Sequence, residues 1–150
     1  MSISLSTVRR CTTSLACLTA CLAGALSGGA LTTSTATTAL PAAHLEAQLT
    51  SSGDPNGSGE VMFTINRSRG RVCATVEWRG IKKPMAAHIH RRSDGEVVVD
   101  LSSTVTGGAS CATGVSKPVI GRILDAPGSY YFNVHNKPYP AGAIQGRLHR

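Results

Sequence analysis

The chain lacks the features on which several common classes of protein depend. Aromatic residues make up 4% of its 150 residues, and charged residues make up 15%. No serine stands in a Gly-x-Ser-x-Gly nucleophile elbow, and the 8 carboxylates are spread out without a clear acid/base pair. The 15 Lys and Arg residues give a net charge of +7 but form no stripe with interleaved aromatics. These absences argue against nucleic-acid binding. They also argue, less strongly, against catalysis, and they do not exclude an enzyme.

A long hydrophobic run is also missing. The longest apolar stretch, Leu15 to Leu26, is interrupted by Thr19 and is too short for a membrane-spanning helix, which needs about 20 residues. Arg9 and Arg10 precede it, and small residues follow at positions 28–30. This order is typical of a secretory signal, so we predict export without a transmembrane span.

The predicted organisation is a signal peptide at 1–30, a Ser/Thr/Ala-rich spacer at 31–42 and a β domain at 43–148. An alternative exit site exists, because Leu18-Thr19-Ala20-Cys21 resembles a bacterial lipobox. In that case Cys21 is lipidated, and the protein is anchored at the cell surface instead of secreted. Ordinary secretion is favoured, since the residues after Cys21 stay apolar where a polar tether is usual.

Cysteines are few once the signal is removed. Three of the 5 fall within the predicted signal, which leaves Cys73 and Cys111. Two cysteines in an exported domain suggest one disulfide. The alternative is a pair of buried free thiols, because sequence spacing alone does not show that the two Cα atoms are close.

Alternation of apolar and polar residues dominates the rest of the chain and predicts short strands. Turn residues separate the strands, notably at Arg69-Gly70 and Asp94-Gly95. Only Lys117 to Asp125 has the length and Leu/Ile spacing of a short helix. We therefore expect an all-β sandwich or barrel of seven or eight short antiparallel strands. The expected core faces carry Val61, Phe63 and Ile65; Val72, Ala74, Val76 and Trp78; Val97, Val99 and Leu101; and Tyr130, Phe132 and Val134.

Three histidines stand out against this pattern. His88 and His90 lie two residues apart, so on a strand they share one face, with Ile89 on the other. The same alternation places His135 outward, beside Asn133. If the two segments are neighbouring strands, three imidazoles meet on the outer face, and imidazole is a common ligand of zinc and copper.

Two interpretations of these histidines stay open. Three histidines with an open water position are typical of a catalytic-type metal site rather than a closed structural one. His44, Asp94 and Glu96 are candidates for a fourth ligand, although spacing supports none of them. In the alternative, which the sequence pattern favours, the histidines donate to backbone carbonyls, pack on Tyr131 and bind nothing.

The histidine segments also carry a family resemblance. Residues 87–90, followed by 97–101, together with 130–148, resemble the CHRD domain, which is named from chordin and also occurs in exported bacterial proteins. The segments around Cys73 and Cys111 resemble members in which these cysteines look paired. The resemblance implies a Greek-key β-sandwich. It also implies an extracellular or cell-surface binding module without defined catalysis, whose partner is an extracellular protein or a cell-wall polymer. A copper or zinc protein that uses His88, His90 and His135 is the alternative.

Overall fold

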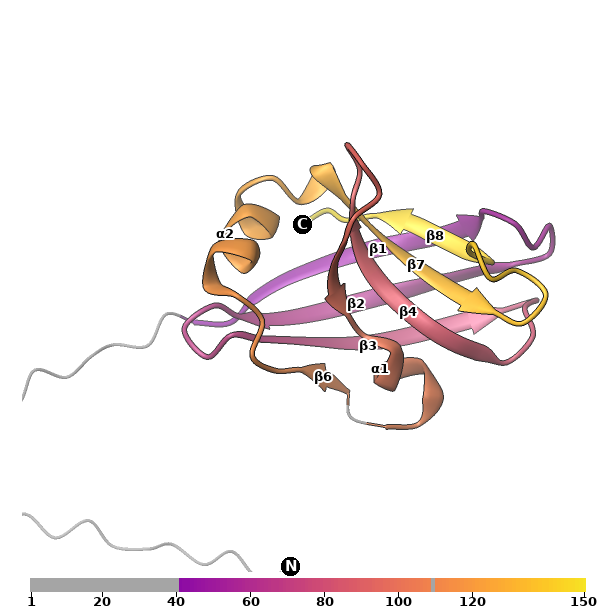
Figure 1. Ribbon diagram of the computed structural model, residues 1–150, viewed down its shortest axis with the longest axis horizontal. Coiled ribbons are helices and arrows are strands. Elements are labelled where there is room, and N and C mark those ends of the chain that lie inside the picture. Colours follow the sequence, from indigo (N-terminus) through magenta and orange to yellow (C-terminus); the bar gives the residue numbers. More distant parts are fainter. Residues whose placement is uncertain (1–40, 109) are drawn as a thin grey trace, which may run out of the picture. The chain divides into compact units, whose positions relative to one another are not determined.

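The alternating segments form one antiparallel sheet of eight strands (Figure 1). The structure is a computed structural model that describes residues 41–108 and 110–150. The predicted signal segment, Cys21 and most of the predicted spacer lie outside these residues. The strands are β1 (Ala43–Ser51), β2 (Ser58–Asn66), β3 (Arg71–Arg79), β4 (Pro84–Arg91), β5 (Val97–Asp100), β6 (Cys111–Ala112), β7 (Tyr130–Asn136) and β8 (Ile144–Arg147).

The strand order is β5-β4-β7-β8-β1-β2-β3-β6, and the sheet curls until it is nearly a barrel. Figure 1 shows β4 and β7 crossing in front of β2 and β3. Across the enclosed space the ring of Phe63 on β2 meets Phe132 on β7 edge to face, with centroids 5.5 Å apart. The prediction of an all-β fold of seven or eight strands is confirmed.

The core consists of the inward faces that alternation predicts, with one difference. Val97 was expected on a core face, but it is 46% exposed. The register of β4 against β5 shifts, since Ile89 pairs with Val99 while His90 pairs with Val97. The additional residue, Val98, forms an irregularity of the bulge type, which takes Val97 off the buried face.

In the described part of the chain, two short helices accompany the sheet. The predicted helix is present as α2 (Lys117–Asp125), with a proline in its first turn and Ile120 and Ile123 buried. A second helix, α1 (Ser102–Thr106), follows β5 directly and ends at Gly107, whose φ is 87°. A 3-10 turn, η1 (Pro127–Ser129), leads into β7. No helix among the described residues is long and apolar enough to cross a membrane.

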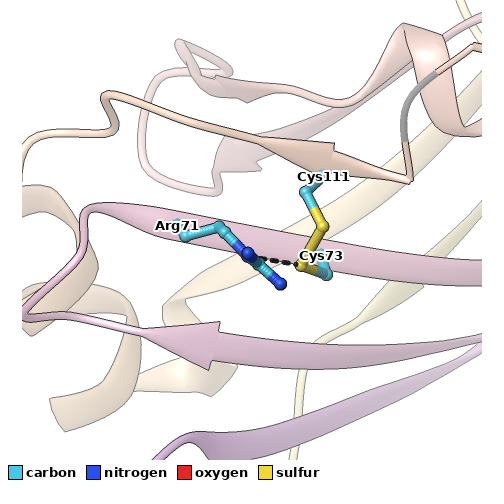
Figure 2. The surroundings of a disulfide bond; sticks show 3 residues. All are labelled: Arg71, Cys73 and Cys111. Carbon is cyan, nitrogen blue, oxygen red and sulfur yellow. Dashed lines mark hydrogen bonds between the residues drawn. A yellow bond between two sulfur atoms is a disulfide. The ribbon is translucent and has the colours of Figure 1, made fainter.

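A disulfide joins Cys73 of β3 to Cys111 of β6 (Figure 2). The two cysteines are also register partners, and Arg71 Nε donates a hydrogen bond to Cys73 Sγ at 3.3 Å. The strand β6 is only two residues long. The disulfide therefore fixes the last strand of the sheet to its neighbour.

Candidate metal centre

The pairing of β4 with β7 brings the three histidines together. Ala86 lies opposite His135, and His88 lies opposite Asn133, in an antiparallel register. The intervening residues, Ala87, Ile89 and Val134, are buried in the core. Because successive side chains alternate between faces, the histidines project from the outer face, as the sequence predicts.

The three rings form a compact triangle. Their centroids are 5.0 Å apart for His88 and His135, 5.5 Å for His88 and His90, and 6.1 Å for His90 and His135. One nitrogen of each ring lies within 4.8 Å of a nitrogen of the other two. The closest approach joins His88 Nδ1 to His135 Nε2 at 3.1 Å.

Backbone carbonyls fix two of the rings from outside the triangle. His90 Nδ1 lies 2.9 Å from the carbonyl oxygen of Gly95, and His135 Nδ1 lies 2.9 Å from that of Pro140. A carbonyl oxygen only accepts hydrogen bonds, so each Nδ1 carries the proton. In the neutral ring the Nε2 atom then holds a free lone pair. Two loops on opposite sides of the site thus set the same tautomer.

Side chains of β5 and α1 hold the third ring. His88 Nε2 lies 3.5 Å from Ser102 Oγ and 3.8 Å from Asp100 Oδ1. The Asp100 carboxylate is itself oriented by the backbone N–H of Ser102 at 2.8 Å. Because His135 Nε2 is unprotonated, His88 Nδ1 donates the 3.1 Å hydrogen bond that joins the two rings. A metal ion bound between these nitrogens would replace that proton, and the proton of the neutral His88 ring would then lie on Nε2, facing these oxygens. Carboxylate and carbonyl partners of this kind typically orient metal-binding histidines.

His90 is more enclosed than a residue on the solvent face is expected to be. It is 8% exposed, because its ring stacks on Tyr131 with centroids 4.9 Å apart and planes 12° apart. Its Nε2 atom is buried and has no hydrogen-bond partner. Within the described ranges, one other buried side-chain polar atom has no hydrogen-bond partner, namely Asn133 Oδ1, and it belongs to the same sheet face. A buried polar atom without a partner costs about 1–3 kcal/mol.

Electrostatics favour the neutral form of His88. Burial lowers the pKa of His88, and the nearby rings of His135 and His90 lower it further, while the Asp100 carboxylate opposes the shift. A metal ion binds the deprotonated form of a ring nitrogen. The lowered pKa therefore keeps His88 in the form that a metal requires.

None of the three candidates for a fourth ligand joins the cluster. Asp94 forms an ion pair with Arg91 at 2.8 Å, and Glu96 pairs with the same guanidinium. His44 lies on β1, where its register partner is Thr64. Among the described residues the group that could hold a metal contains the three histidines alone.

The contacts expected of a purely structural seam are also present. His90 stacks on Tyr131, and two histidines bond to backbone carbonyls. These contacts engage one nitrogen of each of those two rings. They leave His90 Nε2 without a partner. The interpretation in which the histidines only stabilise the sheet therefore does not account for this nitrogen.

The comparison with protein families gives one match. The family model described as "CHRD domain" matches residues 40–148. No curated protein and no solved structure matches the chain.

Proposed function

This chain belongs to the CHRD domain family, and from that premise we propose that it binds a copper or zinc ion through His88, His90 and His135. The family and the β fold support a binding module. The histidine cluster supplies the chemistry that a metal-binding module needs. The observation that carries the proposal is the Nε2 atom of His90, which is buried and has no hydrogen-bond partner. A bound ion would supply the missing partner.

The spacing of the nitrogens fits such an ion. Zinc binds imidazole nitrogens at about 2.0–2.1 Å, so two ligands of a tetrahedral ion lie about 3.3 Å apart. The observed 3.1 Å between His88 Nδ1 and His135 Nε2 is close to this separation. The third nitrogen lies within 4.8 Å, so metal binding would require the His90 ring to shift toward the other two. Copper(II) generally binds nitrogen sites more tightly than zinc, so both metals belong in the test.

Three protein ligands leave a coordination position for water or an exogenous group. The site therefore suits an ion that exchanges with solvent or binds a small ligand. A structural ion, in contrast, has all its coordination positions filled by protein groups. We place this activity outside the cytoplasm, because CHRD domains are extracellular and disulfides persist in oxidising compartments.

The test is metal binding by protein purified without a histidine tag. After loading with Cu(II) or Zn(II) and dialysis, elemental analysis is expected to find one equivalent per chain. Loss of an outer-shell partner typically weakens metal binding by 10–100-fold, so loss of a ligand in His88→Ala or His135→Ala is expected to exceed that. His44→Ala is the matched control, since it removes an exposed histidine of β1 that lies outside the cluster.

Two results would contradict the proposal. Less than about a tenth of an equivalent of either metal on the wild-type protein ends it. Equal binding by His44→Ala and His135→Ala shows that the ion sits elsewhere. Circular dichroism of the metal-free variants checks that each one still folds.

We also propose that the chain is exported through residues 1–30, followed by a spacer to 42 and the β domain. The intact mass of the mature protein distinguishes the two exit routes. Cleavage near Ala30 supports secretion. An acylated form that disappears in Cys21→Ala supports the lipid anchor.

A further inference from the structure

A polar groove crosses the outer face of the sheet next to the histidine cluster. It has a volume of about 410 Å³, which lies in the range of small-molecule sites. Tyr131, which stacks on His90, belongs to both features. The groove is lined by Gln48, Thr50, Arg92, Tyr131, Gln145 and Arg147.

Two arginines in this groove share one acceptor. Arg147 Nε donates to the carbonyl oxygen of Gly128 at 2.6 Å, and Arg92 Nη1 approaches the same oxygen at 3.4 Å. The guanidinium of Arg147 also rests on Gly128, where even a methyl group would come within 3.1 Å of it. The shared carbonyl thus holds two cationic groups side by side.

Neither of these arginines has a carboxylate partner among the residues that the structure describes. The neighbouring Arg91 shows the opposite case, because Asp94 and Glu96 both pair with it. Two adjacent guanidiniums whose remaining N–H groups point to no described anion form a fork suited to a carboxylate.

The other lining groups are neutral and can both donate and accept hydrogen bonds. Gln48 and Gln145 contribute amides, Thr50 a hydroxyl and Tyr131 a phenol. A sugar hydroxyl has the same dual character, whereas a phosphate offers acceptors only. A second groove across β2 and β3 shares Gln48 and Thr50 with the first, and its lining also includes Glu60 and Glu77. These carboxylates repel an anion, so the sugar unit that carries the bound carboxylate is expected in the groove with Arg92 and Arg147.

From this combination we propose that the groove binds an acidic polysaccharide, with Arg92 and Arg147 receiving a carboxylate and the amides and hydroxyls receiving sugar hydroxyls. The site is separate from the three histidine nitrogens. It does not require a metal, so it stands even if the proposed ion is wrong.

The experiment is calorimetric titration with three six-unit probes, using protein that has been stripped of metal with a chelator and then dialysed into chelator-free buffer. A galacturonic acid hexamer carries both carboxylates and hydroxyls, maltohexaose carries hydroxyls only, and hexametaphosphate carries charge only. We expect saturable binding of the acidic hexamer and at least tenfold weaker binding of the other two. Binding of the acidic hexamer is also expected to weaken as salt is raised, because the arginines are exposed.

Substitutions then locate the site. Arg92→Ala and Gln145→Ala are each expected to weaken binding of the acidic hexamer by about tenfold. Arg69→Ala is the matched control, because it removes the same charge from an exposed turn between β2 and β3. The proposal is overturned if the acidic hexamer shows no saturable binding. It is also overturned if hexametaphosphate binds as tightly as the hexamer, or if Arg69→Ala loses as much affinity as Arg92→Ala, since either result would indicate attraction to net charge alone.

Discussion

The disulfide between Cys73 and Cys111 gives a prediction whose size follows from the chain itself. The bridge closes a loop with a sequence separation of 38 residues. Restricting the unfolded chain by a loop of that length stabilises the folded state by about 4 kcal/mol in the chain-entropy description. For a domain of about 110 residues this corresponds to a fall of roughly 15–20 °C in the melting temperature when the bridge is removed.

The assay compares the wild-type protein with the double variant Cys73→Ala/Cys111→Ala by urea unfolding, with and without reductant. Reductant is expected to lower the free energy of unfolding of the wild-type protein close to that of the variant, and to leave the variant unchanged. Amide exchange is expected to rise first in β6, which has two residues and pairs only with β3. A loss smaller than about 1 kcal/mol, or a variant that responds to reductant, would refute the reasoning.

Four further outcomes test the core and the site. Phe132→Ala is expected to cost about 3–5 kcal/mol by urea unfolding, because Phe132 is fully buried and packs on Phe63; a cost below 1 kcal/mol would argue against this core. Gly142→Ala is expected to cost about 1–3 kcal/mol, because Gly142 has a φ of 135° and an added methyl would lie 2.5 Å from Asn133 Oδ1; an unchanged melting temperature would count against that packing. Without metal, the free energy of unfolding should be highest above the unfolded-state histidine pKa of about 6.5. It should fall as the pH drops toward the lowered folded pKa of His88, because the unfolded chain takes up a proton at higher pH than the folded chain does. His88→Asn should reduce this pH dependence, and an unchanged slope would contradict the assignment. Asp100→Ala should weaken metal binding by about 10–100-fold while the metal-free fold persists, and undiminished affinity would show that Asp100 does not orient His88.

Much of the fold could be predicted because its cause is local. Alternation along 61–65 and 130–134 marks the inward faces, and the Leu/Ile spacing of 117–125 marks α2. The same rule places His88 and His90 on one outer face. The helix α1 escaped prediction, since Ser102 to Thr106 is too short and too rich in Ser and Thr to show a helical pattern.

The chemistry of the site depends on contacts that no local pattern encodes. Which ring nitrogen faces inward is decided by the carbonyls of Gly95 and Pro140, and each carbonyl lies in a loop. The enclosure of His90 depends on the register that sets Tyr131 opposite it. Asp100 was missed as a partner of His88 for the same reason, although both lie on strands that the alternation predicts.

The most direct test is the position of a bound ion, located by anomalous diffraction from crystals grown with Cu(II) or Zn(II). We expect one peak about 2.0–2.1 Å from His88 Nδ1, His90 Nε2 and His135 Nε2, with a water or small ligand completing its coordination. A peak bound by other residues, or three rings that keep their present positions with no ion at millimolar metal, would contradict the metal centre.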